Sequence, residues 1–438
     1  MSESILLGDE AVARGAIDAG ITAAYAYPGT PSTEIYQTIE EQAKQQQLTV
    51  RGMWSANEKV ALEQAAGVSY YGCRSLVAMK HVGLNVAADP FMNLAISGVH
   101  GGLVVVVADD PGMHSSQNEQ DSRFFADFAM VPCLEPSDQQ QCYDFTREAL
   151  ELSEHLQVPV LLRLVTRLAH SRAQVQLAPA RAPNQAHRVE DPSRFTLIPV
   201  NARRAYAQLI DKQKALQAYS EAHPVNALTL RDGVRKGIIV SGLAWNYLQE
   251  AMGSALLHFN LLRIGMYPLP TGKMRQLLEA CDEVFVVEEG YPFIERQLGA
   301  LQLIGARTIH GKQSGALPRM GELNQDAIKL CFGLPLSPSL EIPGLAEVMR
   351  GRPPRLCDKC PHTDAYIAIK EVLAELGDGV RVMGDIGCYS LGYLPPHQAI
   401  HACLCMGASI GMAIGAVHAG VNPSLCVIGD VTFTHSGL

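Results

Sequence analysis

Several short segments of the sequence hold residue types that can take part in chemistry. Gly429 and Asp430 follow the apolar run 425–428. A phosphate group can pack against such a glycine while the carboxylate takes one position on Mg²⁺. His435 is either a functional group or an ordinary packing residue. A Gly-Asp pair is common, so its meaning depends on the segments that accompany it.

Residues 27–34 read Tyr-Pro-Gly-Thr-Pro-Ser-Thr-Glu and follow an alanine-rich strand candidate. They open a predicted helix, where backbone amides and hydroxyl groups can face an anion. A proline turn with a helix cap explains the same residues. The segment predicts a helix start and leaves both interpretations open.

Ser55 and Glu58 have the spacing of a capping box, with Ser55 as the N-cap of a predicted buried helix over 59–67. That pattern gives Glu58 a structural role. The alternative is a buried carboxylate that takes part in proton transfer. Taken alone, the segment favours the cap.

A long polar loop is predicted at 109–121, directly after the apolar run 103–108. Loops at the carboxyl end of a buried strand usually line sites. A solvated turn is the alternative, but a turn needs fewer residues than this. We expect the loop to contact a substrate or an interface.

Cys357 and Cys360 form a CxxC pair, followed by Pro361 and His362. A structural zinc site needs four ligands, and no second pair with this spacing is present. A tight turn with two buried thiols explains the pair equally well. The sequence also holds no four-cysteine iron–sulfur run, and its eleven cysteines are expected to be reduced thiols.

The elements that must position these residues are those of an α/β protein. Apolar runs at 103–108 and 158–162 alternate with helical patterns, which predicts a parallel-sheet domain over 1–178. A proline-containing linker with a helical segment near 193–222 fills 179–232, and strands at 237–240 and 283–287 predict a second α/β domain over 233–345.

A third α/β segment is predicted over 350–438. Strand candidates 381–385 and 425–430 each end on an aspartate, at the strand end where open α/β sheets bind ligands. Gly407, Gly411 and Gly415 share one helical face and are expected to allow close packing against a strand or cofactor, or plain helix packing. The segment is short for a finished sheet, so we expect something outside it to complete the domain.

The composition narrows the classes of partner. The 438 residues are 47% hydrophobic and carry a formal charge of −9, with no basic run that could follow a phosphate backbone or an anionic membrane. Neither a nucleic-acid nor a membrane partner is expected. The N-terminus lacks the pattern of a secretory signal, and the apolar stretch 406–420 is too short to span a bilayer, which indicates a cytoplasmic location.

In this order, the segments resemble the large subunits of the indolepyruvate (2-oxoacid) ferredoxin oxidoreductases over essentially the whole chain. The pieces that carry the resemblance are 7–15, 27–32, 57–61, 79–85, 109–112, 115–121, 357–362, 384–387, 406–409 and 429–430. The sequence departs from the family pattern at Asp9, where asparagine is more usual, and at Asp358-Lys359 inside the CxxC. The family's asparagine downstream of Asp430 and its C-terminal ferredoxin-like domain are not found.

The resemblance implies an α/β fold of three parallel-sheet modules of the thiamine diphosphate-binding type, as in transketolase and pyruvate:ferredoxin oxidoreductase, with the last module incomplete. It implies that Glu58 is the catalytic glutamate that hydrogen-bonds the aminopyrimidine of thiamine diphosphate and so promotes formation of the ylid. Thr30, Ser115 and Asn118 are expected to contact substrate. Residues expected to line the cofactor are Gly384, Asp385, Cys388, Met406, Gly407, Gly429 and Asp430, with Asp430 as a ligand of Mg²⁺.

The reaction that the resemblance implies is oxidative decarboxylation of an aryl 2-oxoacid with coenzyme A, giving an acyl-CoA, carbon dioxide and reduced ferredoxin. Expected partners are ferredoxin, a smaller second subunit and a second copy of the chain in a dimer. Iron–sulfur clusters are expected only in the missing C-terminal part or in a partner. Two alternatives stay open: a non-redox thiamine diphosphate decarboxylase, and a non-catalytic assembly or regulatory subunit.

Overall fold

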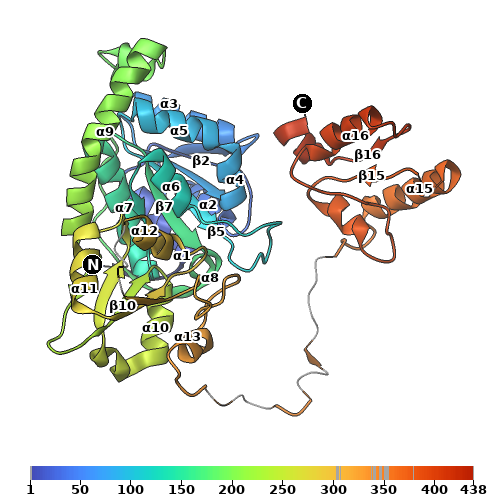
Figure 1. Ribbon diagram of the computed structural model, residues 1–438. Helices are drawn as coiled ribbons and strands as arrows, with labels where there is room; N and C mark the ends of the chain where they lie inside the picture. The colour runs from blue at the N-terminus through green and yellow to red at the C-terminus, as the bar shows by residue number, and fades with distance from the viewer. Residues whose placement is uncertain are drawn as a thin grey trace. The chain divides into compact units, whose positions relative to one another are not determined.

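The chain is seen in a computed structural model that describes residues 2–301, 305, 307–336, 338, 342–344, 348–349, 355–377 and 379–437. It divides into two compact units, Met1–Ser337 and Pro338–Leu438 (Figure 1). The predicted domain limits at 345, 350 and 438 lie outside the described residues.

A seven-stranded sheet forms the centre of the first unit, with strand order β12-β6-β7-β5-β4-β2-β3. All neighbouring strands run parallel except β12 against β6. Every residue of β5 is buried, as expected for a central strand covered on both faces. The strands are β2 (Ala23–Ala26), β3 (Arg51–Trp54), β4 (Ser75–Lys80), β5 (Leu103–Asp109), β6 (Cys133–Leu134), β7 (Val160–Val165) and β12 (Met266–Tyr267).

Helices cover both faces of this sheet. Alternate residues of β5 enter two different hydrophobic clusters, with Val104 and Val106 in one and Val105 and Val107 in the other, because successive strand side chains point to opposite faces. Helices α1 (Gly8–Asp18), α2 (Thr33–Gln45) and α7 (Gln139–Leu156) contribute to the first cluster, and α3 (Glu58–Tyr70), α5 (Ala88–Ser97) and α6 (Arg123–Ala129) to the second. Strand β1 (Ser2–Leu7) pairs antiparallel with β8 (Arg172–Leu177), which follows the short helix α8 (Thr166–His170).

The predicted linker holds the turn η1 (Pro192–Phe195) and the long helix α9 (Pro199–Ala222), so the helix expected near 193–222 is confirmed with a later start. A five-stranded sheet follows, in the order β14-β13-β10-β11-β9 and parallel except for β9. Both predicted strands are confirmed, as β10 (Lys236–Ser241) and β13 (Glu283–Val287). The remaining elements are β9 (Leu228–Thr229), α10 (Ala244–Met252), η2 (Gly253–His258), β11 (Asn260–Ile264), α11 (Thr271–Ala280), α12 (Phe293–Ala300), β14 (Thr308–His310) and α13 (Gln325–Cys331).

A cluster of fully buried charges links the seven-stranded sheet to the five-stranded sheet. The Arg163 side chain, 0% exposed, donates from Nε to Asp109 at 2.7 Å. The Arg123 side chain, also 0% exposed, donates to Asp121 at 2.5 Å and lies 3.1 Å from Glu288 at the end of β13. Because each charge is compensated by its neighbours, loss of one partner would leave a buried uncompensated charge.

The second unit is smaller. Its parallel pair β15 (Val382–Met383) and β16 (Leu425–Cys426) is accompanied by α15 (Pro361–Leu376), η3 (Cys388–Tyr393), α16 (Ala408–His418), α17 (Asp430–Thr432) and the π-helical turn η4 (Phe433–Gly437). Tyr366, Val382, Ala399 and Ile400 form its buried core.

Two of the three glycines on the face of α16 do not pack against another described part of the chain, and the expected approach to a cofactor stays a prediction. A side chain added at Gly411 or Gly415 would meet no described atom within 4 Å. Gly407 differs, since it has φ +86° and an added Cβ would lie 2.4 Å from the Ser436 carbonyl oxygen. Of the helices in the part of the chain that the structure describes, none is long and apolar enough to cross a membrane.

Candidate functional site

The carboxyl ends of β2, β3, β4 and β5 lie side by side at one edge of the large sheet, because these strands are parallel neighbours. Each is followed by a segment that the sequence singled out: 27–33 after β2, 55–58 after β3, α4 (His81–Val86) after β4, and 110–122 after β5. This is the edge at which α/β sheets bind ligands.

Glu58 is the first residue of α3 and its side chain is buried, with the residue 5% exposed. The predicted capping box is wrong. The N-cap is Asn57, whose side-chain oxygen accepts from the Val60 amide at 2.9 Å, while the Ser55 hydroxyl donates to the Gln64 side chain at 2.6 Å. Asn57 is a favoured N-cap residue two positions nearer the helix than Ser55, and it takes the capping position that the sequence assigned to Ser55.

A glycine makes room for the Glu58 carboxylate. A Cβ added at Gly83 in α4 would lie 2.5 Å from Glu58 Oε1 and 2.8 Å from its carboxyl carbon. The side chain of Glu58 therefore lies against the backbone of α4, at a position where a larger residue than glycine would displace it.

The loops after β2 and β5 are joined at this edge. The Ser115 hydroxyl donates to the carbonyl oxygen of Thr30 at 3.1 Å, and the Lys80 ammonium donates to the carbonyl oxygen of Ser115 at 3.0 Å. Asn118 lies in the same loop, and its carbonyl oxygen is 3.1 Å from Nε2 of the buried His81. The structure thus gathers Thr30, Ser115 and Asn118 next to the end of β4.

The loop after β5 has an exposed tip at 112–115 and is anchored by buried carboxylates. Asp110 accepts from the Ser115 amide at 2.9 Å, the Ser116 hydroxyl at 2.7 Å and the Thr166 hydroxyl at 2.8 Å. Burial works against the charge, but these hydrogen bonds outweigh it and hold the pKa of Asp110 below its usual value. Asp109 and Asp121, in the arginine cluster, lie at the two ends of the same loop.

Lys80 was not singled out from the sequence. It is the last residue of β4, and burial lowers the pKa of its ammonium group while the carboxylates of Asp110 and Glu58 oppose the shift. A lysine that ends an otherwise apolar strand is a signal that could have identified it. Its position offers a positive charge to an anionic ligand at this edge.

The second unit gathers another group of predicted residues beyond β15 and β16. The buried Asp385 carboxylate accepts from the amides of Ile386 at 2.9 Å, Gly407 at 2.8 Å and Ser409 at 3.1 Å. It therefore positions the start of α16, next to Met406, and its oxygens are already engaged by backbone amides. Gly384 is buried and donates from its amide to Ala402.

Asp430 begins α17 directly after Gly429 and is exposed. The Thr432 hydroxyl donates to the carbonyl oxygen of Ile386 at 3.3 Å, so this segment lies beside the Asp385 loop. Cys388 is exposed at the start of η3, and its carbonyl oxygen accepts from the Tyr366 hydroxyl at 2.6 Å.

The CxxC pair matches neither a structural zinc site nor a tight turn with two buried thiols. Cys360 is buried and its sulfur lies 3.2 Å from His362 Nδ1, but Cys357 is exposed, so the turn holds one buried thiol. Within the described residues, the group of side chains that could together hold a metal ion is Asp9, Glu34 and His170, which does not include this pair.

The residues present fit parts of a thiamine diphosphate site. Glu58 offers a buried carboxylate with space kept for it by Gly83, which suits the activating group of the cofactor. Asp430 offers one exposed carboxylate, and Mg²⁺ commonly binds one or two carboxylates together with phosphate oxygens and waters.

Comparison with known proteins defines the class. A family model described as pyruvate flavodoxin/ferredoxin oxidoreductase, thiamine diphosphate-binding, matches residues 14–228. A solved structure of 2-oxoglutarate:ferredoxin oxidoreductase from Magnetococcus marinus superimposes with a TM-score of 0.59 at 18% identity, covering 74% of this chain and 64% of that one. The chain has the α/β fold of the thiamine diphosphate-binding oxidoreductases, as predicted.

Curated relatives define the family within this class. The indolepyruvate oxidoreductase subunit IorA of Methanothermobacter thermautotrophicus is 42% identical, and that of Archaeoglobus fulgidus is 39% identical. Each alignment covers 99% of this chain and 71% of the relative. The chain belongs to the IorA family of indolepyruvate oxidoreductase subunits.

Proposed function

We propose that the chain is the thiamine diphosphate-dependent subunit of an indolepyruvate-type ferredoxin oxidoreductase. The observation that carries the proposal is the buried Glu58 carboxylate beside Gly83, at the carboxyl edge of the parallel sheet. The family membership supports the same conclusion. In the reaction, an aryl 2-oxoacid and coenzyme A give an acyl-CoA, carbon dioxide and a proton, and two ferredoxins each gain one electron.

Glu58 is the proton-handling residue in this proposal. When bound, thiamine diphosphate supplies the nucleophilic carbon and the electron sink that decarboxylation of a 2-oxoacid requires. The Glu58 carboxylate holds a proton at the cofactor's ring nitrogen, and its burial excludes water that would compete for that proton. Gly83 keeps the carboxylate in its place.

Thr30, Ser115 and Asn118 are proposed to line the substrate site, with Lys80 as an added member. The hydrogen bonds from Ser115 to Thr30 and from Lys80 to Ser115 hold the two loops together. The Lys80 ammonium supplies a charge of the sign needed for a 2-oxoacid carboxylate.

The second unit is proposed to bind the diphosphate end of the cofactor through Mg²⁺. Asp430 supplies a carboxylate to the ion, Gly429 allows close approach of the diphosphate, Gly407 lines the cofactor, and Asp385 positions α16. The lining is completed by Gly384, Cys388 and Met406.

The assembly is proposed to contain further parts. Members of this family are named as subunits, which supports a smaller second subunit, and ferredoxin is the proposed electron acceptor. Iron–sulfur clusters are proposed to lie outside the residues of this chain, and two copies are proposed to pair so that Glu58 meets a diphosphate held elsewhere. The domain limits 1–178, 179–232, 233–345 and 350–438 and a cytoplasmic location remain proposals as well.

The test is Glu58→Gln in the assembled enzyme, with indolepyruvate, coenzyme A, thiamine diphosphate, Mg²⁺ and ferredoxin. We expect kcat to fall by roughly 10²–10⁴-fold, because loss of a proton-transfer group typically costs that much. Glu63→Gln, on the exposed face of the same helix, is the control and is expected to leave kcat unchanged. Wild-type turnover by Glu58→Gln would refute the role of Glu58.

Two outcomes separate the alternative functions. An aldehyde product without ferredoxin reduction would identify a non-redox decarboxylase. Absence of Mg²⁺-dependent thiamine diphosphate binding in calorimetry, both with the chain alone and with its partner added, would identify a non-catalytic subunit. We expect binding and ferredoxin reduction by the assembled enzyme.

A further inference from the structure

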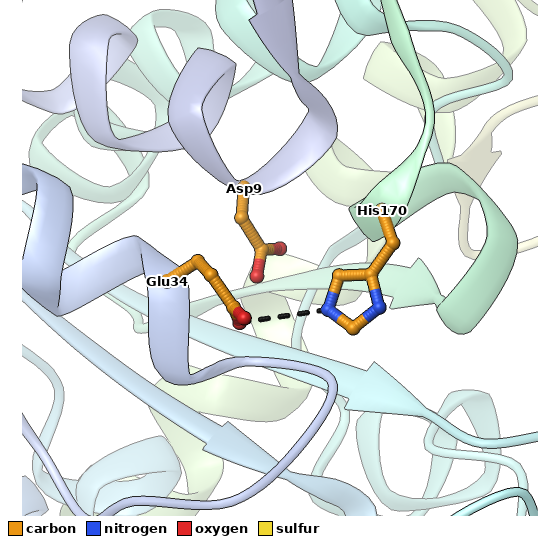
Figure 2. A group of neighbouring side chains, drawn as sticks. All are labelled: Asp9, Glu34 and His170. Atoms are coloured by element: carbon orange, nitrogen blue, oxygen red, sulfur yellow. Dashed lines mark ion pairs between the residues drawn. The ribbon is translucent and has the colours of Figure 1, made fainter. Parts of the chain in front are cut away.

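A second group of side chains converges where the starts of α1 and α2 meet the end of α8. Asp9 from α1, Glu34 from α2 and His170 from α8 place their ligand atoms within 4.8 Å of one another (Figure 2). Glu34 Oε2 and His170 Nε2 are 3.5 Å apart. Residues far apart in the sequence therefore present two carboxylates and one imidazole to a common point.

Asp9 is the unusual member of this group. Its side chain is 0% exposed, and neither carboxylate oxygen has a hydrogen-bond partner among the described residues. Figure 2 shows this carboxylate directed between Glu34 and His170. A buried carboxylate without hydrogen bonds costs several kcal/mol, so such a group calls for a compensating partner.

The charged side chains nearest along the chain are engaged elsewhere. Arg14 forms an ion pair with Asp18 at 2.9 Å. Glu10 accepts from the Leu7 amide at 2.8 Å and lies 3.4 Å from Arg172. Neither arginine is paired with Asp9, so the described protein cations do not account for its burial.

The backbone holds the three side chains in a defined arrangement. A Cβ added at Gly8 would lie 2.2 Å from the Leu168 carbonyl oxygen, so the start of α1 packs directly on α8. The β1–β8 pairing brings Leu7 opposite Arg172, which fixes the residues on either side of this contact. Asp9 and His170 are thus held near each other by the fold.

Two carboxylate oxygens and one imidazole nitrogen are the donor set of divalent first-row transition ions. Metal–ligand bonds of about 2.0–2.2 Å place neighbouring ligand atoms a little over 3 Å apart, close to the separation of Glu34 and His170. The side chains of His170 and Glu34 are 34% and 38% exposed, while Glu34 Oε2 itself is buried and has no hydrogen-bond partner among the described residues, so the group lies at the edge of the protein with one carboxylate oxygen directed inward.

We propose that Asp9, Glu34 and His170 form a binding site for a divalent first-row transition cation such as Zn²⁺, Mn²⁺ or Co²⁺. The site is distinct from the Mg²⁺ position proposed at Asp430 and does not depend on the proposed reaction. A bound ion links the starts of α1 and α2 to the end of α8 and compensates the Asp9 charge. Because α2 follows the loop that contains Thr30, the ion also stabilises one wall of the Glu58 edge.

The test uses the whole chain, freed of metal by a chelator and kept without thiamine diphosphate or Mg²⁺. Titration with Co²⁺ is followed by calorimetry and visible absorption, and we expect one equivalent to bind with the spectrum of a protein-bound ion. Asp9→Asn keeps the shape of the side chain and removes its charge. It is expected to weaken binding by more than the roughly 10–100-fold lost with an outer-shell partner.

Three further variants make the result specific. His170→Ala, at an exposed position, tests the site without disturbing the core and is expected to weaken binding similarly. Glu41→Gln, exposed on α2, and Asp430→Asn in the second unit are expected to bind Co²⁺ as the wild type does. The proposal would be overturned if the wild type failed to bind Co²⁺, or if Asp9→Asn and His170→Ala bound it with wild-type affinity. Asp9 would then be a neutral buried carboxyl group.

Discussion

At the scale of single residues, Lys80 links the features of the Glu58 edge. Its ammonium donates to the loop that holds Ser115 and interacts electrostatically with Asp110 and Glu58. Burial disfavours its charge and the two carboxylates favour it. In the proposed site, the Lys80 ammonium would give up its hydrogen bond to the Ser115 carbonyl oxygen and bind the carboxylate of the substrate instead.

Lys80→Met is therefore expected to raise the KM for the 2-oxoacid by roughly 10–100-fold, since hydrogen bonds to charged groups contribute about 1.5–3 kcal/mol. The effect on kcat is expected to be smaller, because the proposed role of Lys80 is to bind the substrate carboxylate and not to transfer a proton. Steady-state kinetics over a range of 2-oxoacid concentrations measures both parameters. Lys80→Arg keeps the charge and should recover part of the affinity, and an unchanged KM in Lys80→Met would exclude the role.

Single residues also show where sequence reasoning stops. The spacing of Ser55 and Glu58 matches a capping box, but Asn57 caps the helix, because several polar residues before a helix compete for that position. Asp9 stands out in the sequence only as a departure from the family's more usual asparagine, with nothing to indicate its surroundings. Its missing hydrogen bonds become visible only when α8 is packed beside it.

At the scale of elements, the contact between α3 and α4 positions the proposed catalytic group. Gly83→Ala is expected to displace the Glu58 carboxylate, because the added Cβ would lie 2.5 Å from Oε1. We expect a loss of kcat approaching that of Glu58→Gln, measured by ferredoxin reduction. Gly67→Ala in α3 is the matched control, since its Cβ meets nothing within 4 Å, and it should stabilise the helix by about 0.5–1 kcal/mol without loss of turnover. Full activity in Gly83→Ala would contradict the proposed arrangement.

Helices and strands could be predicted where the residues of one segment suffice to indicate the structure. The runs at 103–108 and 283–287 form β5 and β13 because apolar β-branched residues suit strands buried on both faces. The strands expected at 381–385 and 425–430 are shorter, because pairing is limited to two residues on each, and Gly384 donates instead to Ala402. The length of these strands depends on residues distant in the sequence. The same holds for the carboxylates with which Arg123 and Arg163 form ion pairs.

At the scale of the whole first unit, buried carboxyl groups with raised pKa values lie between the seven-stranded and five-stranded sheets. Burial raises the pKa of Glu289 to about 7, although the Leu323 amide donates to one of its oxygens at 3.0 Å. Lys312 and Arg163 favour the charged form and Glu322 opposes it. The stability of this junction should therefore depend on pH near neutrality.

Because the pKa of Glu289 is raised, the folded state keeps a proton between pH 4.5 and about 7 that the unfolded state has lost. The free energy of unfolding of the wild type therefore falls as pH rises through this range. Glu289→Gln cannot ionise. Its free energy of unfolding, relative to the wild type, should increase by about 1–3 kcal/mol across that window and stay constant above it. Denaturant unfolding of the chain at pH 5, 6, 7 and 8 measures the difference. Glu283→Gln, in the same sheet, is the control, because the Lys236 hydrogen bond lowers the pKa of Glu283 below 4.5 and its difference from the wild type should therefore stay constant from pH 5 to 8. A difference independent of pH for Glu289→Gln would mean that Glu289 is ionised throughout and that its neighbours compensate the charge fully.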